Sequence, residues 1–156
     1  MTIRIQTEDF DITEEINILK KARQEKGFQD VGAIVTFTGT VRDMAGTTPI
    51  SSMSLEHYPG MTEKELERIA NEANERWPLL GTTIIHRIGE LNPGDNIVLV
   101  ITLSSHRHAA FEAADFLMDF LKSKAPFWKK EQPLDGDANW VDARDSDKKA
   151  LSRWDK

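Results

Sequence analysis

The sequence of 156 residues contains no cysteine. That absence excludes disulfide bonds, thiolate nucleophiles and cysteine-ligated zinc or iron–sulfur sites. No stretch approaches the roughly 18 consecutive apolar residues of a membrane-spanning helix. The N-terminal segment MTIRIQTEDFDITEE also lacks the apolar region of a secretory signal. We therefore expect a cytoplasmic protein that has no membrane partner.

An excess of positive charge is also missing. The chain carries 20 Lys and Arg residues against 26 Asp and Glu residues, a formal net charge of −6. Broad nucleic-acid binding depends on a positive surface field, so we expect no nucleic-acid partner. The sequence has no Walker loop and no GxGxxG, HExxH or GxSxG motif. Because no Asp or Glu stands at metal-ligand spacing, we predict no metal site and no cofactor.

The length and composition of the chain fit a single domain over residues 1–156. Hydrophobic spacing predicts four helices, over 12–26, 62–77, 107–125 and the tail up to 154. The first two begin at apparent capping boxes, Asp11 with Glu14 and Thr62 with Glu65.

Extended segments alternate with these helices. We expect strands or extended chain at 2–6, 31–42, 50–58, 82–91, 96–105, 126–132 and 136–141. The segment 31–42 is mostly apolar and predicts a buried strand, 43–49 a loop, and 50–58 the returning strand. Helices interleaved with hairpin-like strand pairs predict an α+β fold with a mainly antiparallel sheet.

Positive charge is concentrated in FLKSKAPFWKKEQ, which places four lysines within nine residues around a proline and two aromatic residues. Lysines near a helix C-terminus are favoured by the helix dipole alone, and lysines on an extended segment are usually solvated. The stretch His106-Arg107-His108 is less easily explained, because the N-terminus of a helix disfavours cations. A bound anion would account for it. His57 and His86 we interpret as structural.

Several segments resemble the large, catalytic subunit of molybdopterin synthase, the MoaE family. They are GAIVTFTGTVR, LEHYPGMTEKELERIANEANERWP, IIHRIGELNPGDNIVLV, SSHRHAAFEAADFLMDFLKSKAPFWKKE and WVDARDSD. The resemblance implies an α/β hammerhead fold and a sulfurtransferase of molybdenum cofactor biosynthesis. Such an enzyme converts cyclic pyranopterin monophosphate into molybdopterin. The sulfur comes from the C-terminal Gly-Gly thiocarboxylate of a small ubiquitin-like subunit, within a heterotetramer built on a homodimer.

The resemblance also implies roles for individual residues. Lys122 and Lys129 match the catalytic lysines of the family. The matched substrate contacts and their neighbours are Arg42, His106 and Arg107, flanked by Thr40, Val41, Lys130 and Glu131, with Phe37 and Arg144 as further candidates. These cations would compensate two anions, the cyclic phosphate and the thiocarboxylate.

Two other functions remain open from the residues alone. The chain could be a non-catalytic module that binds a ubiquitin-like partner, in which case His106 and Lys122 would tolerate replacement. It could also be an RNA- or nucleotide-binding domain, although only Phe127 and Trp128 offer aromatic stacking. We further expect a dimer formed through strand and loop edges, and a site that draws residues from both subunits.

Overall fold

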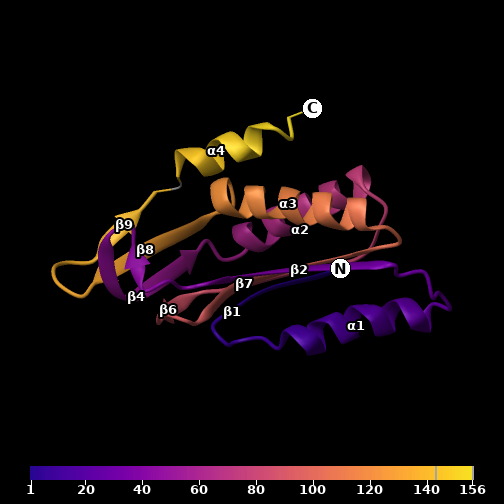
Figure 1. Cartoon of the computed structure of the whole chain (residues 1–156), viewed down its shortest axis with the longest axis horizontal. Coiled ribbons are helices and arrows are strands. Elements are labelled where there is room, and N and C mark those ends of the chain that lie inside the picture. Colours follow the sequence, from indigo (N-terminus) through magenta and orange to yellow (C-terminus); the bar gives the residue numbers. More distant parts are fainter. Residues whose placement is uncertain (143, 156) are drawn as a thin grey trace.

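A four-stranded sheet forms the centre of the computed structural model, which describes residues 1–142 and 144–155. The strand order is β1 (Thr2–Gln6), β5 (Leu79–Arg87), β7 (Asn96–Ser104) and β2 (Ala33–Thr40). Strands β1 and β5 are parallel, and the other two pairings are antiparallel. Helix α1 (Ile12–Glu25) lies on one side of this sheet, and helices α2 (Met61–Arg76) and α3 (Arg107–Ser123) lie on the other (Figure 1).

The central strand β7 is buried on both of its faces. Leu99 and Ile101 pack into the cluster beneath α1, whereas Val98 and Val100 pack into the cluster beneath α2 and α3. Successive side chains of a strand point to opposite faces, so a strand covered on both sides is apolar throughout. This explains the unbroken run NIVLVITLS and confirms the strand predicted there.

A second, antiparallel sheet lies beside the first, at the left of Figure 1. It contains β3 (Met44–Ala45), β4 (Thr48–His57), β8 (Phe127–Pro133) and β9 (Asn139–Val141), and β6 (Gly89–Leu91) also pairs with β4. The sheet has its own small core of Val41, Ile50, Met53, Leu55 and Leu91. The predicted α+β class with mainly antiparallel pairing is confirmed.

The chain passes from the first sheet to the second within the segment that was predicted as one strand over 82–91. That prediction is wrong, because β5 ends at Arg87 in the first sheet and β6 begins at Gly89 in the second. Gly89 has φ 87°, a conformation that L-residues with a side chain rarely adopt. The glycine therefore redirects the chain from one sheet to the other.

The prediction of a buried strand over 31–42 is also wrong. Strand β2 forms an edge of the first sheet, and Ile34 and Phe37 are 39% and 41% exposed. These two side chains are not covered within this chain, whereas Val35 packs against the core. The apolar pattern of β2 nevertheless resembles that of an interior strand. The returning strand, β4, pairs with β8 instead of β2. The predicted loop over 43–49 contains β3 and the start of β4, joined by a turn at Gly46.

The second predicted capping box is shifted in the structure. Gly60, not Thr62, precedes α2, and its N–H donates to the Glu63 carboxylate at 2.5 Å. The Thr62 hydroxyl is buried, where it accepts from the Tyr58 N–H at 2.9 Å and donates to the Pro126 carbonyl at 3.0 Å. The bond to the Pro126 carbonyl thereby holds the short segment between α3 and β8, which lies within the lysine-rich stretch.

Helix α4 (Asp145–Ser152) packs on α3 and confirms the helix predicted in the tail. Its C-terminal end is held by Asp119, which accepts from Arg153 and from the Trp154 indole N–H, both at 2.6 Å. The Trp154 ring also contacts Trp77 and Phe116 edge-on, with centroid distances of 5.6 and 5.5 Å. Among the described residues, no helix is long and apolar enough to cross a membrane.

Candidate active site

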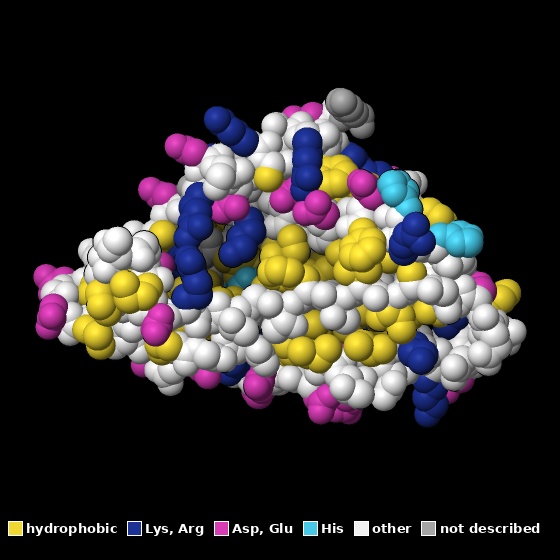
Figure 2. All heavy atoms as spheres, in the orientation of Figure 1, with side chains coloured by type: hydrophobic (Ala, Val, Ile, Leu, Met, Phe, Trp, Pro, Cys, Tyr) yellow, Lys and Arg dark blue, Asp and Glu magenta, His cyan; other side chains and the backbone are white. Residues whose placement is uncertain are grey.

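A cavity of about 620 Å³ opens where the C-terminal end of α3 meets the second sheet. Lys and Arg side chains line both sides of a recess in Figure 2. Apolar side chains of α3 and β8, among them Met118, Leu121 and Phe127, form part of its wall. The cavity therefore combines positive charge with apolar walls, which suits a ligand that has an anionic group and a flat, uncharged part.

Lys122 and Lys129 both line this cavity, although they belong to different elements. Lys122 lies in the last turn of α3. Lys129 lies on β8, where alternation turns Phe127, Lys129 and Glu131 to the cavity side. The Lys129 ammonium is 3.4 Å from the Glu131 carboxylate. The structure thus brings the two lysines together, and their catalytic role stays a prediction.

The pKa of Lys122 is lowered from its ordinary value. Burial is the largest cause, and the positive charges of Lys129, Arg144 and Arg42 add to it, while Asp147 acts in the opposite direction. The Lys122 side chain remains accessible to solvent, but it lies within a concave wall where the surrounding protein reduces its hydration. A lowered pKa makes the neutral amine more accessible near neutral pH.

Arg42 and Arg144 complete a set of four cations around the cavity. Arg42 follows β2, and Arg144 is the residue that precedes α4. The acidic side chains that also line the cavity are Glu131, Asp142 and Asp147. Positive charge prevails over negative charge, and guanidinium groups suit phosphate or carboxylate oxygens.

The remaining residues that the resemblance assigned to the site lie in different places. Thr40 lines the cavity, and Val41 is buried in the core next to it, at 3% exposure. The Lys130 ammonium lies over the Trp140 ring, 5.4 Å from its centroid, and does not line the cavity. Phe37 lies on the exposed edge strand, outside the cavity lining.

His106 and Arg107 lie at the opposite end of α3 from Lys122. A rise of 1.5 Å per residue places Arg107 about 22 Å from Lys122 along the helix axis. Both residues are exposed, and neither lines the cavity. Within one chain, the cavity is therefore assembled without the HR pair.

His86 lines the cavity although its sequence position indicated a structural residue. It lies near the end of β5, and its ring is stacked on Phe127. His86 lies within one of the segments that resemble the family, but no catalytic motif marks it. Its approach to the cavity depends on the pairing of β4 with β8, which is remote from His86 in sequence.

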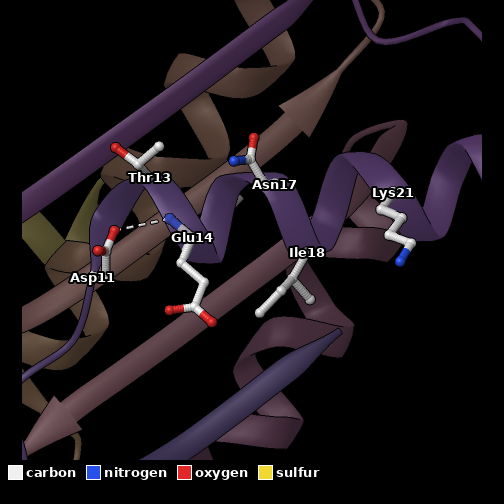
Figure 3. Close-up of a pocket in the computed structure, with 6 residues that line it drawn as sticks. All are labelled: Asp11, Thr13, Glu14, Asn17, Ile18 and Lys21. Atoms are coloured by element: carbon white, nitrogen blue, oxygen red, sulfur yellow. Dashed lines mark hydrogen bonds between the residues drawn. The ribbon is translucent and has the colours of Figure 1, made fainter.

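A smaller hollow of about 360 Å³ lies on the outer face of α1 (Figure 3). It is lined by residues of this helix and its N-terminal cap, namely Asp11, Thr13, Glu14, Asn17, Ile18 and Lys21. Asp11 caps the helix by accepting from the Glu14 N–H at 2.9 Å, as predicted. The hollow is open and formed by one helix, so it offers no enclosed binding site. Among the described residues, no cluster of three or more potential ligands is placed to hold a metal ion.

The fold and the cavity define a mixed α/β protein with a pocket lined by four cationic side chains. A sequence model of the MoaE protein family matches residues 5–124. The molybdopterin synthase catalytic subunit of Mesorhizobium japonicum is 56% identical over 154 residues, which cover 98% of this chain and 92% of that protein.

Solved structures agree with this result. The molybdopterin biosynthesis MoaE protein of Burkholderia ambifaria has a TM-score of 0.81 and 51% identity, covering 98% of this chain and 97% of that one. Molybdopterin synthase from Staphylococcus aureus has a TM-score of 0.74 and 34% identity, covering 88% and 94%. The chain belongs to the MoaE family. At the level of this family, the predicted function of a molybdopterin synthase catalytic subunit, a sulfur-transferring enzyme, is confirmed.

Proposed function

We propose that the cavity between α3 and β8 binds cyclic pyranopterin monophosphate beside the C-terminal thiocarboxylate of a small ubiquitin-like subunit. The chain would then transfer sulfur to form the dithiolene of molybdopterin, acting as a single domain in the cytoplasm. The observation that carries this proposal is the convergence of Lys122, Lys129, Arg42 and Arg144 on one cavity. Two anionic groups that meet in one pocket require such compensation.

The two lysines supply the acid–base chemistry in this proposal. Attack by the thiocarboxylate, opening of the cyclic phosphate, loss of water and hydrolysis of the acyl link each move a proton or develop negative charge. A positioned amine or ammonium can serve each step as base, acid or electrostatic stabiliser. The lowered pKa of Lys122 favours its neutral amine, so it is the better candidate for the base.

The phosphate is held by arginine in this proposal. Arg42 and Arg144 approach the cavity from two elements, the end of β2 and the start of α4. A guanidinium presents a planar fork that matches two phosphate oxygens, whereas a lysine offers a single point charge. The lysines are then free for proton transfer while the arginines fix the substrate.

His106 and Arg107 contribute to the site from a second copy of the chain. Strand β2 is an edge strand of its sheet, and no strand of the described residues pairs with its outer edge. Exposed apolar side chains lie on this edge and near the N-terminal end of α3, including Phe37 at 41% and Phe111 at 61% exposure. Hydrophobic side chains gather in the middle of the face seen in Figure 2. An uncovered strand edge with apolar neighbours favours pairing with another chain.

The central experiment incubates the chain with its thiocarboxylated small subunit and the cyclic substrate, and follows dithiolene product. Lys122→Ala should abolish product while partner binding persists. If turnover survives this substitution, the chain is better described as a module that binds the partner without catalysing the transfer.

Mixed dimers test the shared site separately. Lys122→Ala and Arg107→Ala should each be inactive alone. Random mixing makes half of the dimers heterodimers with one intact site each, so about one quarter of wild-type activity should return. If mixing restores nothing, each site lies within one chain, and the cavity chemistry is unaffected by that result.

A further inference from the structure

His86 is a buried, titratable side chain of the cavity that the proposed mechanism does not use. It is 7% exposed and lies near the end of β5, opposite Val98 of β7 and Ile5 of β1. Alternation along β5 turns His86 to the same face as Ile84, beneath α3. His86 lines the cavity together with the Lys and Arg side chains described above.

Two independent contacts fix the orientation of the imidazole ring. Its Nδ1 is 2.8 Å from the Arg87 carbonyl oxygen. A carbonyl oxygen can only accept a hydrogen bond, so Nδ1 carries the proton and Nε2 has a free lone pair. The ring also stacks on Phe127, with centroids 3.8 Å apart and an interplanar angle of 17°. Nε2 has no hydrogen-bond partner among the described residues, which leaves it available to a ligand.

The surroundings keep this ring neutral. Burial lowers the pKa of His86 to about 4, and the positive charge of Lys122 and the neighbouring His57 act in the same direction. The hydrogen bond to the Arg87 carbonyl opposes them only in part. The other charged groups around the cavity are Arg42, Lys129, Arg144, Glu131, Asp142 and Asp147. A neutral imidazole in a mainly cationic cavity provides an acceptor that does not bring in a negative charge.

We propose that Nε2 of His86 accepts a hydrogen bond from an N–H or O–H group of the substrate, and so determines which ring system the cavity binds. This inference rests on the proposed function. Lysine and arginine side chains can only donate hydrogen bonds, so they recognise the anionic part of the substrate. A pterin also carries N–H donors, and a buried donor requires an acceptor. His86 supplies that acceptor in a fixed direction.

Two amide substitutions separate this role from a structural one. In His86→Asn, the new side-chain amide lies near the Nδ1 position and retains the bond to the Arg87 carbonyl, but it leaves no acceptor at the Nε2 position. His86→Gln places its amide oxygen near the Nε2 position. Binding of the cyclic substrate is measured by titration calorimetry on the chain without its small subunit, so that no sulfur is transferred. His86→Asn should weaken binding by roughly three- to tenfold, the range for one neutral hydrogen bond, and His86→Gln by less.

A measurement on the wild-type protein tests the proposal even if the substituted variants fail to fold. In protein with ¹⁵N-labelled histidine, the His86 Nε2 resonance should be that of an unprotonated nitrogen and should move upfield when substrate binds. His57→Asn is the matched control, because His57 lies near Phe127 in β4 but does not line the cavity. Its affinity for substrate should stay at the wild-type value.

The outcomes distinguish this inference from the proposed function. If wild-type protein binds no cyclic substrate, the proposed function fails and this inference fails with it. If wild-type protein binds but the Nε2 resonance stays in place, or His86→Asn binds as tightly as wild type, only the role of His86 is refuted. A protonated Nε2 in the free protein at neutral pH also refutes it.

Discussion

Replacement of Lys122 by methionine should remove activity and yet stabilise the folded protein. Methionine keeps the length and apolar stem of the side chain and removes its charge. Burial and the charges of Lys129, Arg144 and Arg42 oppose the Lys122 ammonium, whereas Asp147 favours it. Because the pKa of Lys122 is lowered on folding, the charged form destabilises the native state at neutral pH.

The size of the gain follows from two opposing contributions. Relief of unfavourable surface charge commonly stabilises a protein by about 0.5–2 kcal/mol. Loss of a cation from the last turn of α3 costs about 0.3–1 kcal/mol of helix-dipole stabilisation. Taking the middle of each range, we expect a net gain of about 0.6 kcal/mol at pH 7. The gain should shrink as the pH rises through the folded pKa towards the ordinary value of 10.5, because wild-type Lys122 then loses its charge as well.

The activity of Lys122→Met should fall at least a hundredfold in the dithiolene assay, as expected for loss of a general acid or base. A hundredfold loss corresponds to about 2.7 kcal/mol of activation barrier. Lys122→Arg should not restore turnover, since a guanidinium stays protonated and cannot act as a base. Single-turnover rates and urea unfolding, measured on the same preparations, give both quantities.

Lys124→Met is the matched control. Lys124 follows α3 directly, is exposed and does not line the cavity. Its replacement therefore changes stability only through the loss of a cation at the C-terminal end of the helix. This variant should keep wild-type activity and be slightly less stable. If Lys122→Met retains more than about a tenth of the wild-type rate, its loss costs under roughly 1.4 kcal/mol, which is too little for an essential acid or base. Lys122 would then have no essential part in proton transfer.

Three further perturbations test other parts of the structure. Lys129→Ala should reduce turnover at least tenfold more than Lys130→Ala, because only the first side chain reaches the cavity; equal losses in the dithiolene assay contradict this. Trp154→Ala should destabilise the protein by about 2–3 kcal/mol, less than a fully buried tryptophan, and should also lower kcat/KM as α4 loosens. Unchanged kinetics, despite a lower unfolding midpoint, would show that α4 does not shape the site. Gly32→Ala should cost more than about 2 kcal/mol, because the new Cβ would overlap the Ser105 carbonyl oxygen. A wild-type melting temperature in this variant refutes that close approach.

The elements that could be predicted from sequence are those with a strong local signal. The helical stripe of α3 and the apolar run of β7 are long and regular, so their types and approximate bounds followed directly. The edge position of β2 could not be predicted, because apolar residues such as Ile34 and Phe37 give the same sequence pattern in an edge strand as in an interior strand. The prediction that Thr62 caps α2 was wrong for another reason. Its spacing to Glu65 fits a capping box by chance, whereas the structure uses Gly60 and Glu63.

The candidate site could be predicted only in part. The resemblance to the family supplied the two lysines, and their spacing around Pro126 made a shared pocket reasonable. The distance of His106 and Arg107 from that pocket follows from the length of α3, a helix predicted over 107–125, and it agrees with the expectation that a site draws residues from both subunits. His86 was not recognised because its neighbour Phe127 reaches it only through long-range strand pairing.

The break at Gly89 bears on how the reacting groups are spaced. Lys122 stands on a helix that packs on the first sheet, whereas Lys129 is part of the second sheet. The gap between the two amines therefore depends on how the two sheets pack against each other, and the break at Gly89 is one of the places where the chain passes from one sheet to the other. We expect any displacement of the second sheet relative to the first to change the separation of the Lys122 and Lys129 amines.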